Sequence, residues 1–178
     1  MIFEEKTVDS TTYFDGRIIK LKVDTVVLPD GRSATRELVN HPGGVGIIAL
    51  DKDDMVYMVR QYRKPYDEIV LEIPAGKLNY GEDPFQCGKR ELKEEVGVTA
   101  DNFECLGVYY PTPGFCDEKI TLYLATDLQY GNTNPDDDEY LEIEKYKIDD
   151  LYTMVMNNEI HDAKTAIAIL KTYSKVRR

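Results

Sequence analysis

Alternating and continuous apolar runs predict strands in the first third of the chain. Runs of this kind occupy residues 17–23, 26–28, 37–39, 46–50 and 55–59. A turn-forming sequence at 29–32 separates the early runs, and the charged segment 51–54 separates the last two. The runs on either side of segment 51–54 therefore predict a buried hairpin. Later strands are expected near 69–73, 103–110, 120–125 and 141–146.

The segment after residue 82 predicts a helix with clear ends. Asp83 can cap it, Pro84 occupies a first-turn position that needs no amide, and Gly97 can end it in a left-handed conformation. A second helix is expected at about 160–174. With few helices and many strands, the pattern favours an α+β fold in which a mixed sheet is sandwiched between helices.

Composition narrows the functional classes. The 178 residues suit one domain, or one domain with a short dimerisation arm. A net charge of −11 opposes nucleic-acid binding, and three cysteines with two histidines disfavour disulfides and zinc sites. The absence of a long apolar run and of a signal-peptide pattern argues against a membrane or secreted protein. We therefore expect a cytoplasmic protein with reduced thiols, no nucleic-acid partner and no membrane association.

Four glutamates cluster in and beside the first predicted helix: Glu82, Glu91, Glu94 and Glu95. The last three share one flank about 100° wide, where like charges repel each other. A divalent cation such as Mg²⁺ or Mn²⁺ would remove this repulsion and could hold a diphosphate. The alternative from the helix alone is a solvated, glutamate-rich face.

Residues 76–98 fit the pattern G-x5-E-x7-R-E-U-x-E-E-x-G-U, where U is aliphatic, at every constrained position. This pattern resembles the Nudix box of the Nudix hydrolases, which cleave nucleoside diphosphates linked to another group. The resemblance implies an α/β/α sandwich with a loop-helix-loop metal site. It also implies backbone roles for Gly76 and Gly97 and makes the Ala75 carbonyl a candidate metal ligand.

The resemblance assigns roles to the charged residues of the box. Glu91, Glu94 and Glu95 match metal-binding glutamates, and Glu82 matches a loop glutamate that assists water or metal placement. Arg90 matches an arginine that orients a carboxylate by pairing with it.

A further resemblance, outside the box, is to the ADP-ribose pyrophosphatase branch. Pro113 and Gly114 lie in a Thr-Pro-Gly-Phe segment like one that shapes the ribose site, although Thr112 replaces the common serine. Arg36 and Arg63 are candidates for substrate phosphate or ribose contacts, because guanidinium groups bind such oxygens bidentately. The alternatives are an ordinary loop proline and surface arginines in salt bridges.

The general base is expected in the acidic loop that precedes the strand near 141–146. The resemblance favours a glutamate there; we select Glu139 and keep Asp137, which has a shorter side chain, as the alternative. A merely solvated loop is the third reading. The segment 162–165 also resembles this branch, where its role is structural.

These observations predict a hydrolase that depends on Mg²⁺, or alternatively on Mn²⁺, and converts ADP-ribose to AMP and ribose 5-phosphate. Residues 1–40 are expected to contribute dimerisation and substrate contacts in a homodimer, and residues 41–178 to form the hydrolase domain. The alternatives are a pyrophosphatase for another substrate, such as GDP-mannose or NADH, and a non-catalytic sensor of ADP-ribose or NAD.

Overall fold

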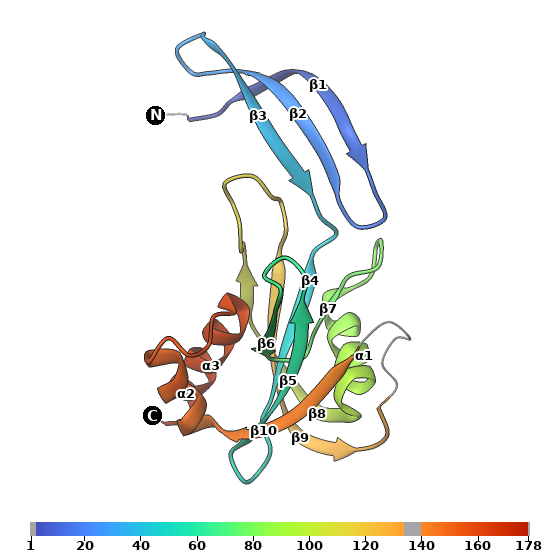
Figure 1. The fold of residues 1–178 in the computed structure, drawn as a ribbon, viewed down its shortest axis with the longest axis vertical. Coiled ribbons are helices and arrows are strands. Elements are labelled where there is room, and N and C mark those ends of the chain that lie inside the picture. Colours follow the sequence, from blue (N-terminus) through green and yellow to red (C-terminus); the bar gives the residue numbers. More distant parts are fainter. Residues whose placement is uncertain (1–2, 134–139, 178) are drawn as a thin grey trace. The chain divides into compact units, whose positions relative to one another are not determined.

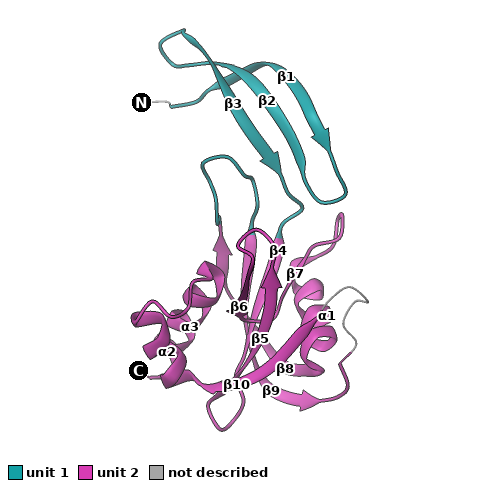
Figure 2. Ribbon diagram, in the orientation of Figure 1, with its two compact units in different colours: residues 1–43, 110–119 teal, residues 44–109, 120–178 magenta. Residues whose placement is uncertain are grey.

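The structure, a computed structural model, describes residues 3–133 and 140–177. The chain forms two compact units, one of residues 1–43 and 110–119 and the other of residues 44–109 and 120–178 (Figure 2). Backbone hydrogen bonds place 110–119 in the first unit: the amide of Val39 donates to the carbonyl of Phe115 at 2.8 Å, and that of Asp117 to the carbonyl of Val39 at 3.1 Å.

The first unit contains a three-stranded antiparallel sheet in the order β1-β2-β3. Its strands are β1 (Lys6–Asp15), β2 (Lys20–Val27) and β3 (Ser33–Asn40). Gly31, with a φ of 85°, occupies the predicted turn between β2 and β3. Every residue of β1 is exposed, whereas Asp24 and Val26 of β2 are buried.

The second unit contains two sheets with the orders β10-β5-β6 and β7-β4-β9-β8. The first is antiparallel, whereas β4 and β9 in the second run parallel, so the strand arrangement is mixed. The strands are β4 (Gly44–Ala49), β5 (Met55–Arg63), β6 (Glu68–Glu72), β7 (Ala75–Lys77), β8 (Val98–Tyr109), β9 (Ile120–Tyr130) and β10 (Leu141–Lys147).

Helices cover both faces of these sheets. In Figure 1, α1 (Pro84–Val96) lies on one side, and α2 (Ile148–Met156) and α3 (Ala163–Val176) lie on the other. Alternate residues of β4 divide accordingly: Val45 and Ile47 belong to the cluster packed on α1, and Ile48 to the cluster packed on α2 and α3. The predicted α+β class and α/β/α sandwich are confirmed.

One local expectation is wrong, one helix was not expected, and one expected helix is confirmed. The runs 46–50 and 55–59 do not form a hairpin, because β4 and β5 belong to different sheets and share only an isolated bridge between Leu50 and Val56. Helix α2 was not predicted. The expected C-terminal helix is present as α3. Within the described ranges, no helix is long and apolar enough to cross a membrane.

Candidate active site

Helix α1 begins and ends as its sequence predicts. The Asp83 side chain accepts hydrogen bonds from the amides of Phe85 and Gln86, and a proline occupies the first turn. Gly97 ends the helix with a φ of 67°. Because the caps fix both ends of α1, they also fix the positions of its glutamates along the helix axis.

Two carboxylates of α1 are buried rather than solvated. The exposed fractions of Glu91 and Glu95 are 8% and 3%, and both residues lie on the helix beside the apolar contacts of Leu92 and Val96. One oxygen of Glu95 accepts a hydrogen bond from the amide of Ala75 at 3.0 Å. Because burying a carboxylate is costly without compensation, a solvated glutamate face does not describe this side of the helix.

The backbone of β7 lies against the Glu91 carboxylate. A Cβ atom placed on Gly76 would lie 1.9 Å from the carboxyl carbon of Glu91, so no larger residue fits without displacing that group. The close approach brings the backbone at Ala75 and Gly76 beside the two buried carboxylates. The backbone role expected of Gly76 therefore has a steric explanation: a side chain at this position would overlap the Glu91 carboxylate.

Arg90 forms ion pairs with three carboxylates of the cluster. Its Nε donates to Glu82 at 3.0 Å, and its Nη1 lies 2.8 Å from an oxygen of Glu94 and 2.7 Å from one of Glu91. The hydrogen bond from Arg90 to Glu82 lowers the pKa of Glu82 against the opposing effect of burial. One guanidinium thus faces three carboxylates, and the cluster keeps a negative excess.

Cys87 lies within this cluster, a position that was not predicted from the sequence. Its Sγ is 4.0 Å from Glu91 Oε1 and accepts from Arg90 Nη2 at 3.4 Å. Burial, together with the charges of Glu91 and Glu82, raises the pKa of the thiol to about 12, so it is neutral. Its spacing of four residues before Glu91 on a helix was the signal that could have placed it there.

Arg63 is held by a buried carboxylate. Its Nε and Nη2 donate to the two oxygens of Glu72 at 2.6 and 2.7 Å, and Glu72 is 2% exposed. These hydrogen bonds raise the pKa of Arg63 against the cost of burial, and the charges of Glu72, Asp162 and Glu95 raise it further. Arg63 is thus close enough to the α1 carboxylates to interact with Glu95. Glu72 was not among the predicted site residues.

The remaining predicted substrate residues belong to the first unit. Arg36 forms a bidentate pair with Glu5, at 2.8 Å from Nε and 2.5 Å from Nη2. Pro113 and Gly114 lie in a turn in which the amide of Cys116 donates to the carbonyl of Thr112 at 3.0 Å. The roles of Arg36, Pro113 and Gly114 stay predictions.

The two candidates for the general base, Asp137 and Glu139, lie outside the described residues.

The donor chemistry of the cluster suits a hard divalent cation, because its side-chain donors near Ala75 are carboxylate oxygens. In the described part of the chain, no three acidic, histidine or cysteine side chains converge as ligands of one ion. Arg90 and the amide of Ala75 engage the glutamates instead. The residues fit a divalent cation by their chemistry, because the carboxylates outnumber the one guanidinium that they face.

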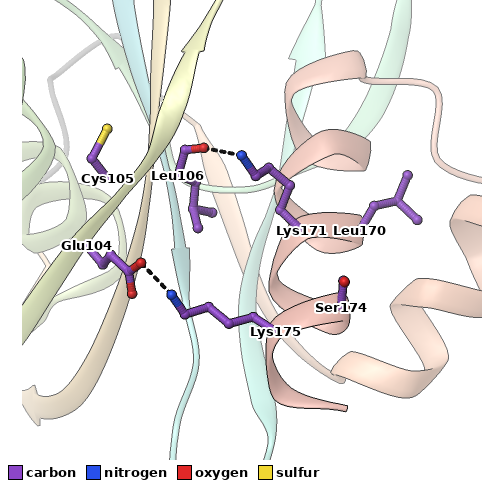
Figure 3. A pocket seen from close by; sticks show the side chains of 7 residues that line it. All are labelled: Glu104, Cys105, Leu106, Leu170, Lys171, Ser174 and Lys175. Carbon is purple, nitrogen blue, oxygen red and sulfur yellow. Dashed lines mark hydrogen bonds and ion pairs between the residues drawn. The ribbon is translucent and has the colours of Figure 1, made fainter. Parts of the chain in front are cut away.

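A separate cavity of about 390 Å³ lies between β8 and α3. Figure 3 shows that two lysines lining it already have protein partners: Lys171 donates to the carbonyl of Leu106, and Lys175 pairs with Glu104. None of the α1 carboxylates lines this cavity. The candidate active site is therefore the carboxylate cluster.

Comparison with known proteins places this site in a family. Residues 40–167 match the family described as the NUDIX domain. The chain belongs to the Nudix family. Residues 5–39 of this Nudix protein match the nucleoside diphosphate sugar hydrolase N-terminal domain. Nudix hydrolases generally use a divalent metal, in agreement with the carboxylate donors at α1.

Relatives of this Nudix hydrolase align over most of its length. A methanol dehydrogenase activator of Bacillus methanolicus is 42% identical over 170 residues, covering 94% of this chain and 92% of the relative. An ADP-ribose pyrophosphatase of Bacillus subtilis is 40% identical over 168 residues, covering 93% and 91%. A crystal structure of an ADP compounds hydrolase has the same fold, with a TM-score of 0.85 at 18% identity over 98% of this chain and 95% of that one.

Proposed function

We propose that this Nudix hydrolase cleaves the diphosphate of ADP-ribose, giving AMP and ribose 5-phosphate. The observation that carries the proposal is the buried pair Glu91 and Glu95 against the backbone of Ala75 and Gly76, within a cluster of net negative charge. The 40% identity to an ADP-ribose pyrophosphatase along nearly the whole chain supports the choice of substrate.

Glu91, Glu94, Glu95 and the carbonyl of Ala75 would hold the metal, with Mg²⁺ as the first choice and Mn²⁺ as the second. The bound cation would neutralise the diphosphate and lower the pKa of a coordinated water. Arg90 would orient the carboxylates that it contacts, and Glu82 would assist through Arg90.

The other proposed residues lie outside the box in the sequence. Arg63 and Arg36 would bind phosphate or ribose oxygens, and Pro113 and Gly114 would shape the ribose site. Glu139 would take the proton from the attacking water, with Asp137 as the alternative. Loss of activity in Glu139→Gln but not in Asp137→Asn would support this order, and the reverse result would favour Asp137.

We also propose a cytoplasmic homodimer in which residues 1–40 contribute to the interface. The match of 5–39 to a domain named for nucleoside diphosphate sugar hydrolases supports a contribution of this segment to substrate binding. Light scattering coupled to gel filtration tests the assembly. A dimer that becomes a monomer when residues 1–40 are removed is the expected result.

Phosphate release in a coupled phosphatase assay tests the activity. ADP-ribose, GDP-mannose, NADH and diadenosine polyphosphates are compared with and without Mg²⁺. We expect kcat/KM for ADP-ribose to exceed the others by at least tenfold, or about 1.4 kcal/mol in transition-state binding. A different leading substrate would contradict the specificity, and binding of ADP-ribose without turnover would favour a sensor.

A further inference from the structure

Glu72, the last residue of β6, is a buried carboxylate with two cationic partners. Arg63 binds both of its oxygens, and the ammonium group of Lys164 binds one of them. The side chain of Glu72 is 2% exposed, whereas that of Arg63 is 37% exposed. The pair is therefore one-sided: the carboxylate is fixed inside the protein and the guanidinium reaches toward the surface.

The start of α3 holds this arrangement in place. Asp162 caps the helix by accepting from the amide of Thr165 at 3.0 Å, and it lies 3.0 Å from the ammonium group of Lys164. The hydroxyl of Thr165 accepts from the amide of Ile73, the residue after Glu72, at 2.9 Å. Helix α3 is thus bound to the strand that leads directly into Ala75 and Gly76.

A buried ion pair rarely stabilises a fold more than apolar side chains of the same volume would. Stability alone therefore explains this network poorly, while control of geometry explains it well. Glu72 uses the edge of the guanidinium formed by Nε and Nη2. The edge that includes Nη1 is not used by Glu72, and a guanidinium can bind carboxylate on one edge and phosphate on the other.

We propose that Glu72, with Lys164 as its second counter-ion, is a positioning residue that turns the outer edge of Arg63 toward the diphosphate of the substrate. The segment 162–165 thereby contributes to substrate binding as well as to folding. This inference rests on the proposed function, since it concerns the same substrate. It assigns Glu72 no contact with the substrate itself.

Steady-state kinetics with ADP-ribose and Mg²⁺ tests the inference in Glu72→Gln. A glutamine side chain replaces one of the two acceptor oxygens by an NH2 donor, so the bidentate pair with Nε and Nη2 is lost and Arg63 loses its fixed orientation. We expect KM to rise at least tenfold while kcat changes less than threefold, because a phosphate contact made equally in the ground and transition states affects KM alone. Should Glu72→Gln fail to fold, Glu72→Gln/Lys164→Met removes both charges and is expected to show the same change.

A double-mutant cycle with Arg63→Met separates positioning from a structural role. If Glu72 acts through Arg63, adding Glu72→Gln to Arg63→Met leaves KM unchanged. The matched control is Glu144→Gln, which breaks the pair of Arg60 and Glu144, 2.6 Å apart, in which the arginine lies on the same strand β5. We expect KM of this control to equal that of the wild type.

Two results would overturn the inference. One is an unchanged KM in Glu72→Gln with active wild type; the other is additive effects of the two substitutions on KM. If the wild type hydrolyses none of the nucleotides, the proposed function fails first and the inference fails with it. These outcomes are distinguished by the wild-type measurement.

Discussion

Two carboxylate clusters of the second unit differ in their charge balance. At α1, Glu82, Glu91 and Glu94 face the guanidinium of Arg90, and Glu95 lies nearby against the backbone of β7. Where β6 meets α3, the carboxylates of Glu72 and Asp162 face two cations, Arg63 and Lys164. In the first cluster the carboxylates outnumber the one guanidinium that they face, whereas in the second the carboxylates and the cations are equal in number.

This difference separates a cluster suited to binding a cation from a network that fixes the orientation of Arg63. A cluster with uncompensated negative charge gains from a cation because the cation relieves repulsion among its members. A balanced network gains nothing comparable, and breaking it leaves an unpaired charge inside the protein. Variants that change one cluster without the other should separate these two roles.

The largest effect is expected for Glu95→Gln. The substitution keeps an acceptor for the amide of Ala75, but it removes a charge from the proposed metal site. We expect kcat to fall by about 10²- to 10³-fold, the range for loss of one electrostatic contact to the reacting groups. Initial rates at saturating Mg²⁺ measure it. Glu68→Gln on the exposed start of β6 is the control, and comparable rates in both variants would contradict the assignment.

Gly76→Ala should damage the same cluster through sterics alone. Its new methyl group would overlap the Glu91 carboxylate, which must move. Displacing a reacting group by about 1 Å costs on the order of 10²-fold in rate, and we expect a loss of that size. Kinetics together with an unchanged circular dichroism spectrum tests this. Full activity would show that the Glu91 carboxylate need not lie against β7.

Glu72→Gln should change stability in a pH-dependent way, unlike the α1 variants. Burial raises the pKa of Glu72, but hydrogen bonds from Arg63 and the charge of Lys164 outweigh it, so the folded-state pKa lies below 4.5. The ionised carboxylate thus stabilises the fold above pH 4.5, and this contribution is lost as the pH falls through the folded-state pKa. We expect the variant to be less stable by about 2 kcal/mol at pH 7.

Urea unfolding at several pH values measures this prediction. The difference in free energy of unfolding between wild type and Glu72→Gln should be constant from about pH 7 to about pH 5 and should shrink below pH 4.5. A difference that stays constant into the acid range would show that the carboxylate charge does not stabilise the fold.

The smallest effect is expected for Arg90→Gln without metal. Removing this cation from among the α1 carboxylates should lower Tm by about 2–4 °C, equivalent to about 1 kcal/mol. Added Mg²⁺ should then raise Tm of the variant more than that of the wild type, because one less positive charge faces the α1 carboxylates in the variant. Thermal unfolding with and without Mg²⁺ measures both shifts; equal Mg²⁺ shifts would show that the charge of Arg90 does not affect metal binding at α1.

The parts of the fold that could be predicted are those that depend on residues close together in the sequence. The caps of α1 and the spacing of Glu91, Glu94 and Glu95 depend on nearby residues, and the structure confirms the helix. The hairpin of β4 and β5 was wrong because strand partners are chosen by distant segments: β4 pairs with β7 and β9, and β5 with β6 and β10. Periodicity alone carries no information about those partners.

The same limit explains what the site prediction missed. Glu72 stands 92 residues from Lys164 in sequence, so no local pattern could join them. Arg63 was predicted as a substrate contact, but its buried partner is visible only in the folded chain. The position of Cys87 beside Glu91 could have been predicted, because the two residues are four apart on one helix. Cys87 was instead interpreted only as a reduced thiol.

Titration with Mn²⁺, followed by electron paramagnetic resonance, needs no substrate and reports on the metal site alone. We expect the wild type to bind Mn²⁺, and Glu91→Gln and Glu95→Gln each to weaken binding by at least tenfold, while Glu144→Gln leaves it unchanged. Equal Mn²⁺ affinity in all four proteins would contradict the claim that the α1 carboxylates form the metal site.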